Sequence, residues 1–337
     1  MYRIGIIGTR SMGRTHSASY LALSRDHDVV VSAIAGKNPE RLQVLAKEWP
    51  EAKLYTEGEE LLDDESIDAV DLCIPTYLHA EFAIAAMEKG LNVFLEKPVC
   101  NSFSEIESLL ETKKRTGVQV MVGQVCRFFP EYLFLKEAVD SGCYGKLNSL
   151  VMYRQNSSDR TAPRGFNDWY SNPILGGSVV MDLHVHDVDI TRWILGEPND
   201  YTVFAKESTP KYFEHIVTKY DYKDVFVVAE AVWDYVRSVP FEMAYRAGFD
   251  AATVMYNSSF SPTLKVYEGL SDISSPELFE GEPDDVKQLS GYYYQLRYFV
   301  EQCISQKPIE INSLEDAVNS TKLALMEYQR AVSNLSK

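Results

Sequence analysis

Three ionisable side chains stand at helical spacing in the segment 176–196, whose sequence is GGSVVMDLHVHDVDITRWILG. Asp182, His186 and Asp189 occupy positions i, i+4 and i+7, so a helix would place them on one stripe. Ionisable groups among apolar neighbours cost free energy unless they are paired, and histidine titrates near neutral pH. The spacing therefore favours proton transfer from this helix. The alternative is an N-capped interface helix with a paired histidine.

A second candidate follows a short apolar segment, NVFLEKP, at residues 92–98. The segment predicts a strand, with Glu96 and Lys97 at its carboxyl end, which is the edge of an open α/β sheet where ligands bind. An ammonium group beside a carboxylate at that edge can act on a bound substrate. A surface ion pair before a proline turn is the alternative.

A cofactor that reacts beside these ionisable side chains would be held by the N-terminal segment of the chain. Residues 2–7 predict a strand, GTRSMG at 8–13 a glycine turn, and the following residues a helix. Strand, turn and helix in this order form the context of a dinucleotide-binding fingerprint, with the pyrophosphate over the helix N-terminus. Gly8 permits the turn and Gly13 the close approach of the helix. Arg10 stands where the fingerprint usually has its middle glycine. Its side chain could place a charge near a phosphate, or it could simply be an exposed arginine in an ordinary turn.

The cofactor type is predicted from the end of the second expected strand, residues 29–35. An acidic residue at this point commonly binds the ribose 2′-hydroxyl of NAD. Here Gly36 and Lys37 follow the strand, and Arg41 stands one helical turn later. Cations without a carboxylate favour a 2′-phosphate, so NADP is expected over NAD. The alternative is that Lys37 and Arg41 only begin a solvated helix.

Composition limits the class of protein. A chain of 337 residues with 45% hydrophobic and 24% charged residues predicts two globular domains. A net charge of -16 argues against nucleic acid or an anionic membrane as the partner. No apolar run is long enough to span a bilayer. The N-terminus reads as a strand and not as a signal peptide. The five cysteines are scattered, which predicts reduced thiols in a cytoplasm and no metal site.

The second half of the chain predicts a sheet and the roof of a pocket. Residues 201–267 contain successive segments rich in β-branched and aromatic residues, typical of an antiparallel sheet, and two helices follow residue 292. An apolar open face of such a sheet could pair with a second copy, as a homodimer or homotetramer. The long polar loop 156–177 is expected to cover the substrate. Candidate contacts in or next to it are Arg154, Asn156, Arg160, Arg164 and, weakly, Trp169, each of which also fits a solvated or structural role.

Taken together, these segments resemble the Gfo/Idh/MocA oxidoreductases, NAD(P)-dependent enzymes that act mainly on sugars and cyclitols. The matching pieces are IGIIGTRSMGRTH, AGKNPER, DAVDLCIPTYLHAEFAIAAMEKGLNVFLEKP, VGQVCRFFPEYLFLKEAVDSGCYGKL and WYSNPILGGSVVMDLHVHDVDITRWILG. The resemblance implies an α/β fold. A Rossmann domain with a doubly wound parallel sheet (residues 1–122) is expected to precede an α/β domain with a large, mostly antiparallel open sheet (residues 123–337) for substrate binding and oligomerisation.

The resemblance also implies the site. Lys97, Asp182 and His186 are the expected catalytic residues, with His186 as acid or base and Asp182 orienting the substrate. The resemblance gives Gly8, Gly13, Pro75, Thr76, His79, Glu96, Lys97 and Arg127 as cofactor-binding residues. The glycine turn and the end of the second strand add Arg10, Ser11, Met12, Gly36, Lys37 and Arg41. The expected substrate-binding residues are Lys97, Arg127, Trp169, Asp182 and His186. Arg10 and Gly36 depart from the family pattern.

The expected reaction is hydride transfer between nicotinamide and a carbinol or carbonyl carbon of a sugar, sugar derivative or cyclitol. Two other functions stay open. One is a sensor that binds NADP and a ligand without chemistry. The other is a hydrolase or lyase that oxidises its substrate transiently on the same scaffold. The residues do not select one sugar or cyclitol, because pocket loops vary freely on one fold.

Overall fold

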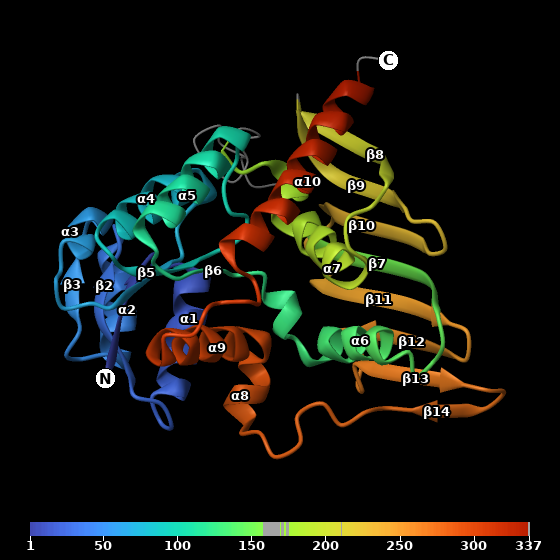
Figure 1. The fold of residues 1–337 in the computed structure, drawn as a ribbon, viewed down its shortest axis with the longest axis horizontal. Coiled ribbons are helices and arrows are strands. Elements are labelled where there is room, and N and C mark those ends of the chain that lie inside the picture. The colour runs from blue at the N-terminus through green and yellow to red at the C-terminus, as the bar shows by residue number, and fades with distance from the viewer. Residues whose placement is uncertain (158–168, 170–171, 173–174, 210, 336–337) are drawn as a thin grey trace. The chain divides into compact units, whose positions relative to one another are not determined.

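The computed structural model describes residues 1–157, 169, 172, 175–209 and 211–335, and Figure 1 shows its elements. The chain forms two compact units. Met1–Phe129 and Gly281–Asn319 make up the first, and Pro130–Glu280 and Ser320–Lys337 the second. The expected division at residue 122 splits the chain once, into two consecutive segments. In the structure, residues 281–319 also pack into the first unit. The assignment of cofactor binding to one domain and substrate binding to the other stays a prediction.

The first unit contains a six-stranded, fully parallel sheet in the order β3-β2-β1-β4-β5-β6. This confirms the expected Rossmann sheet. The strand order reverses between β1 and β4, so the ends of these two strands flank the switch point at which such sheets bind ligands. The strands are β1 (Tyr2–Ile7), β2 (Val29–Ala35), β3 (Lys53–Tyr55), β4 (Ala69–Leu72), β5 (Asn92–Leu95) and β6 (Val120–Val122).

Helices connect these strands, and their ends follow from local chemistry. The Asn38 side chain accepts a hydrogen bond from the backbone N–H of Arg41 at the start of α2, and Ser102 caps α5 in the same way through Glu105. Gly117 ends α5 in the left-handed conformation. The helices are α1 (Ser11–Leu23), α2 (Pro39–Glu48), α3 (Gly58–Leu62), α4 (His79–Glu88) and α5 (Phe103–Thr116), with short 3-10 turns η1 (Thr76–Leu78) and η2 (Val125–Phe128).

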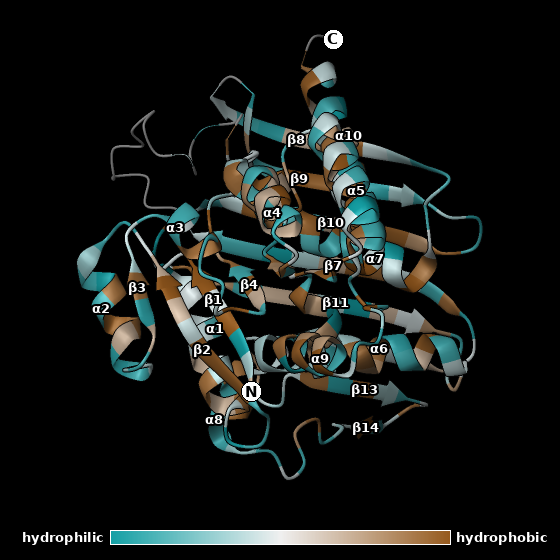
Figure 2. Ribbon diagram, turned by 60° about the vertical axis from the view of Figure 1, so that its left-hand side comes forward, coloured by the Kyte–Doolittle hydropathy of each residue, from teal (hydrophilic) through white to brown (hydrophobic). Residues whose placement is uncertain are grey.

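Two late helices, α8 (Asp284–Leu289) and α9 (Gly291–Ser305), complete the first unit. Leu296, Phe299 and Val300 of α9 join Ile4, Tyr20 and other residues of β1 and α1 in one buried cluster. Strands β1 and β2 are hydrophobic along most of their length in Figure 2, as expected for a parallel sheet covered on both faces. This apolar surface explains why a segment near residue 300 returns to the N-terminal sheet.

The second unit has an eight-stranded sheet in the order β14-β13-β12-β11-β7-β10-β9-β8. Only the β7–β10 pairing is parallel among the described strands, which confirms a large, mostly antiparallel sheet. The strands are β7 (Leu147–Ser157), β8 (Asp200–Thr209), β9 (Tyr212–Asp221), β10 (Phe226–Tyr235), β11 (Glu242–Phe249), β12 (Ala252–Asn257), β13 (Leu264–Glu268) and β14 (Asp272–Ser274).

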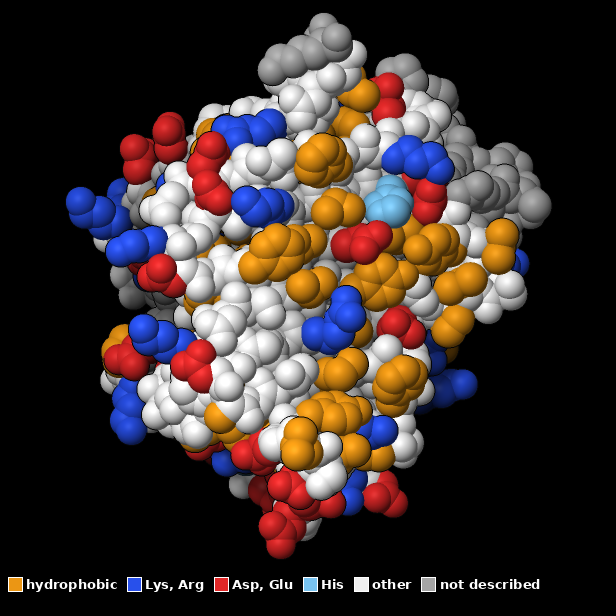
Figure 3. Space-filling model, turned by 90° about the vertical axis from the view of Figure 1, so that its right-hand side faces the viewer, with side chains coloured by type: hydrophobic (Ala, Val, Ile, Leu, Met, Phe, Trp, Pro, Cys, Tyr) orange, Lys and Arg blue, Asp and Glu red, His pale blue; other side chains and the backbone are white. Residues whose placement is uncertain are grey.

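One face of this sheet is covered by α6 (Pro130–Ser141), a π-helical turn (Val180–His184), α7 (Val185–Leu195) and the later part of α10 (Leu314–Asn334) (Figure 1). The other face carries apolar side chains between charged ones (Figure 3). Phe204 and Phe226 are 66% and 53% exposed. Among the described residues, no helix combines the length and the apolar composition needed to cross a bilayer.

Candidate functional site

The glycine turn after β1 is closed so tightly that a Cβ atom has no room. Gly8 has φ +111°, and a Cβ there would lie 2.1 Å from the carbonyl oxygen of Cys73 at the end of β4. A Cβ on Gly13 would lie 1.9 Å from the carbonyl oxygen of Gly8. Both positions therefore require glycine. Because neither residue has a side chain, neither covers the N-terminus of α1. The turn fits a pyrophosphate against backbone N–H groups.

The other residues of this turn are placed as a phosphate site requires. Arg10 is exposed at the N-cap of α1 and its side chain makes no capping hydrogen bond. Ser11 and Met12 form the first turn of α1, where backbone N–H groups lack helical partners. Arg10 therefore offers a guanidinium group at the same helix end to which a phosphate would bind.

At the end of β2, Gly36 packs against Thr9, and a Cβ on Gly36 would lie 2.6 Å from the Thr9 side chain. An acidic residue at this position would need Thr9 to move. The Lys37 ammonium lies 3.2 Å from the Glu57 carboxylate on the surface, and Arg41 is exposed on α2. The expected cations are thus present at this strand end, but a carboxylate already pairs with one of them.

Pro75 and Thr76 follow β4, and His79 begins α4. The His79 ring is buried, with Nδ1 2.7 Å from the Pro98 carbonyl oxygen and Nε2 2.9 Å from that of Ile74. Burial lowers the pKa of His79. His79 joins the loop after β4 to the loop after β5, so it would contribute to cofactor binding by holding these loops in place.

Glu96 and Lys97 follow β5, as expected. The Glu96 carboxylate is buried and accepts a hydrogen bond from the backbone N–H of Lys97 at 3.2 Å. Lys97 is half-buried. Arg127, in η2, is 4% exposed and its guanidinium lies 2.5 Å from the Asp316 carboxylate. The structure thus places Lys97 at the end of the strand next to β4, and ties Arg127 to the start of α10.

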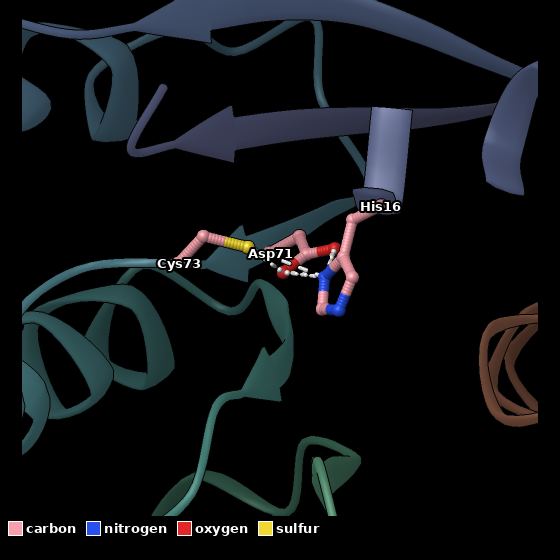
Figure 4. Close-up of side chains that lie close together, drawn as sticks. All are labelled: His16, Asp71 and Cys73. Carbon is pink, nitrogen blue, oxygen red and sulfur yellow. Dashed lines mark hydrogen bonds and ion pairs between the residues drawn. The ribbon is translucent and has the colours of Figure 1, made fainter. Parts of the chain in front are cut away.

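A buried polar cluster lies beneath this strand end, and the sequence patterns did not predict it. His16 of α1 lies 2.9 Å from the carboxylate of Asp71 on β4, and the Cys73 sulfur lies 3.2 Å from the same imidazole nitrogen (Figure 4). The other His16 nitrogen is 3.3 Å from the Glu96 carboxylate. An aspartate inside the apolar strand AVDLC was the available signal, because a buried charge requires a partner.

In the second unit, Asp182 lies in a π-helical turn and His186 in the first turn of α7. Single π-turns within helices are frequent at functional sites. Asp182 is half-buried and His186 is 9% exposed. The expected single stripe of an α-helix is interrupted by the π-turn. Asp189 is buried and accepts a hydrogen bond from Ser320 at 2.7 Å, so Asp189 has a structural role.

Two further buried polar contacts hold this segment, and the sequence patterns predict neither of them. Asp187 forms a buried pair with the Arg154 guanidinium at 2.9 and 3.3 Å. His184 lies 2.7 Å from Glu327 of α10. Trp169 is half-buried, while Arg160, Arg164 and most of the expected roof loop lie outside the described residues. Arg154, an expected pocket residue, is therefore a buried support of α7.

Comparisons with known proteins agree with this arrangement. Residues 2–124 match the model of an oxidoreductase family with an NAD-binding Rossmann fold, and residues 132–242 match the C-terminal domain model of the same family. The chain belongs to the Gfo/Idh/MocA family. The first match includes the glycine turn, Glu96 and Lys97, and the second includes Asp182 and His186.

Several named dehydrogenases are similar to part of the chain. Myo-inositol 2-dehydrogenase of Thermotoga maritima is 32% identical over 206 residues, 61% of this chain and 58% of that protein. D-xylose 1-dehydrogenase (NADP(+)) 2 of Haloferax volcanii is 32% identical over 58% of each chain. Scyllo-inositol 2-dehydrogenase (NAD(+)) of Bacillus subtilis is 35% identical over 46% of this chain and 43% of that protein. The chain thus spans less than two thirds of these relatives' lengths.

Solved structures show the same fold over nearly the whole chain. Levoglucosan dehydrogenase in complex with NADH has a TM-score of 0.85 at 19% identity, covering 98% of this chain and 97% of that one. UDP-N-acetylglucosamine 3-dehydrogenase from Acidithiobacillus ferrooxidans has a TM-score of 0.78 at 19% identity, covering 98% of each chain. At this identity the likeness concerns the fold alone.

Proposed function

We propose that this protein is an NAD(P)-dependent dehydrogenase that acts on a CH–OH group of a sugar, sugar derivative or cyclitol. The observation that carries the proposal is the glycine cradle at the β1/β4 switch point, with Lys97 at the end of the next strand. The cradle fits a dinucleotide because neither Gly8 nor Gly13 can carry a Cβ. The names of the family's inositol and xylose dehydrogenases support the substrate class.

The bound nicotinamide would supply the hydride acceptor or donor. In the direction of oxidation, His186 removes the proton of the substrate hydroxyl, and the Lys97 ammonium stabilises the negative charge that develops on the same oxygen. Asp182 orients the substrate. In the reverse direction His186 returns the proton. Arg127 and Trp169 are proposed as further contacts to the nicotinamide end and the substrate.

For the cofactor, we propose that NADP is preferred over NAD. Gly36 leaves no carboxylate at the end of β2, and its packing against Thr9 opposes one. Lys37 and Arg41 supply positive charge beside that strand end, and a 2′-phosphate would compete with Glu57 for Lys37. Titration of the apoprotein with NADPH and NADH, followed by nicotinamide fluorescence, compares the two affinities. Tighter binding of NADH would contradict the preference.

The experiment that tests the reaction compares wild type with Lys97→Met and His186→Ala on a panel of sugars and inositols. Each variant is expected to bind NADPH as wild type does and to lose turnover by at least about 100-fold. Lys114→Met, which removes an exposed lysine of α5, is the control and should retain full turnover. Turnover retained in Lys97→Met or His186→Ala would contradict their roles.

The same assay separates the alternatives. Tight NADPH binding without turnover of any member of the panel would favour a sensor. Product formation without a net change in the absorbance of the reduced nicotinamide would favour a hydrolase or lyase with transient oxidation. Either outcome would contradict the proposal that the protein is a dehydrogenase.

We also infer that the outward face of the eight-stranded sheet pairs with a second copy of the chain, in a homodimer or homotetramer. That face holds a shallow pocket of about 320 Å³ lined by residues of β7, β11, β12 and β13, among them Tyr153 and Met255. Exposed Phe204 and Phe226 extend the apolar surface (Figure 3). Light scattering should give a multiple of the chain mass for wild type and a smaller mass for Met255→Lys. A monomeric wild type would contradict this inference.

A further inference from the structure

The cluster around His16 connects two parts of the proposed cofactor site. His16 lies on α1, the helix whose N-terminus follows the glycine turn, and its ring lies between two carboxylates. Nδ1 is 2.9 Å from Asp71, and Nε2 is 3.3 Å from Glu96. The side chains of His16 and Asp71 are fully buried and that of Glu96 is 8% exposed.

Two buried carboxylates at opposite ring nitrogens require a counter-charge. Nδ1 forms a hydrogen bond with Asp71, whereas Nε2 and Glu96 make an ion-pair contact at 3.3 Å, which only the charged imidazolium satisfies. Burial alone lowers the pKa of His16, but the nearby Asp71 carboxylate raises it well above its usual range. The other ionisable groups at the cluster are the Cys73 thiol and the Tyr20 phenol, and burial raises the pKa of each. The rings of Phe94 and Tyr292 also pack against the His16 ring.

The Glu96 carboxylate in turn fixes the peptide of Lys97. One carboxylate oxygen lies beside His16, and the other accepts the backbone N–H of Lys97 at 3.2 Å. Gly123 lies against the same oxygen that faces His16, because a Cβ on Gly123 would lie 2.8 Å from Glu96 Oε1. The carboxylate is therefore held between His16, Gly123 and the Lys97 backbone.

We propose that His16 is a positioning residue, whose imidazolium bridges Asp71 and Glu96 and so sets Lys97 relative to the phosphate-binding helix. This inference rests on the proposed dehydrogenase function, in which Lys97 stabilises the alkoxide. Loss of His16 should slow the reaction more than it weakens cofactor binding, because the bridge acts on the peptide of Lys97.

A metal ion explains the cluster less well, although ligand atoms of His16, Asp71 and Cys73 all lie within 4.8 Å of one another. The Cys73 sulfur is 3.2 Å from the His16 nitrogen and 3.3 Å from Asp71. These are hydrogen-bond distances between a thiol, an imidazole and a carboxylate, so the three groups already satisfy one another.

The first test is spectroscopic and needs no substrate. The chain has six histidines, so ¹⁵N-histidine labelling gives a spectrum that can be counted, and the signal lost in His16→Gln is that of His16. At pH 8 the His16 ring is expected to show two protonated nitrogens. A neutral ring at pH 8 overturns the proposal, as does stoichiometric Zn²⁺ binding by wild type that His16→Gln abolishes.

The second test measures kcat and the Kd of NADPH separately. His16→Gln is expected to reduce kcat by about tenfold with less than about threefold change in Kd, Glu96→Gln is expected to reduce kcat by a similar factor, and the double variant is expected to lose no more kcat than either single one. His27→Gln removes a histidine paired with Glu301 elsewhere in the same unit and is the control. Wild-type kcat in His16→Gln, or multiplied losses in the double variant, overturns the proposal.

The two tests also distinguish this inference from the proposed function. A wild-type protein that turns over no sugar or polyol removes the dehydrogenase proposal and, with it, the role of His16 in the rate. The histidine spectrum of the same sample still decides whether the imidazolium bridge exists. If His16→Gln does not fold, Glu96→Gln identifies the His16 signal by its shift and keeps the kinetic test open.

Discussion

Replacing Gly8 by alanine tests the glycine cradle on which the cofactor site is built. The new Cβ would lie 2.1 Å from the Cys73 carbonyl oxygen, whereas real Cβ atoms essentially never come closer than 3.0 Å. The turn after β1 or the end of β4 must therefore move by about 0.9 Å, and the φ of +111° adds strain. Overpacking typically costs about 1–3 kcal/mol, and such a backbone conformation a further ~1–3 kcal/mol.

Gly117→Ala is the matched control, because Gly117 also has a positive φ, +73°, but a Cβ there meets nothing within 4 Å. The control should cost only about 1–2 kcal/mol. Urea unfolding should place Gly8→Ala at least about 1 kcal/mol below the control. Fluorescence titration should show weakened NADPH binding in Gly8→Ala alone. Equal stability of the two variants together with wild-type NADPH binding in Gly8→Ala would refute the cradle.

Three further predictions concern the support of the two units and the cofactor. Arg154→Met should lower the free energy of unfolding by about 3–5 kcal/mol because it leaves Asp187 buried without its counter-charge, and a loss below about 1 kcal/mol in urea unfolding would contradict this. Burial raises the pKa of Asp64, but hydrogen bonds from Ser66, Lys53 and Tyr55 outweigh burial and lower it. Wild type should therefore be more stable than Asp64→Asn above about pH 4, and this difference should disappear as the pH falls further. A stability difference that persists in acid would contradict the prediction. Glu57→Gln releases Lys37 from its exposed ion pair, which is worth about 0–1 kcal/mol. The variant should therefore bind NADPH up to about fivefold more tightly at low salt and bind NADH as wild type does. Equal effects on both cofactors would show that Lys37 does not meet the 2′-phosphate.

The sequence predicts the two sheets because their signals are local. Apolar segments of six and seven residues mark β1 and β2, and Gly8 and Gly13 mark a turn whose geometry excludes a Cβ. Lys97 is placed correctly at a strand end for the same reason. The roles of Lys97, Asp182 and His186 stay predictions, drawn from resemblance and supported by family membership.

Contacts between distant segments could not be read in this way. His16 and Asp71 are separated by 55 residues, and only the partnering rule for a buried aspartate hints at the contact. Residues 281–319 return to the first unit because α9 covers apolar surface of β1 and α1, which chain order does not show. The π-turn before α7 likewise arises where periodicity predicts a regular helix.

The most direct test of the account is a crystal structure of the protein with NADPH and a polyol that it turns over. We expect one substrate hydroxyl to lie within about 3.2 Å of both the Lys97 ammonium and the His186 imidazole, with its carbon facing nicotinamide C4. A bound polyol whose reacting hydroxyl meets neither group, with NADPH in place over the glycine turn, would contradict it.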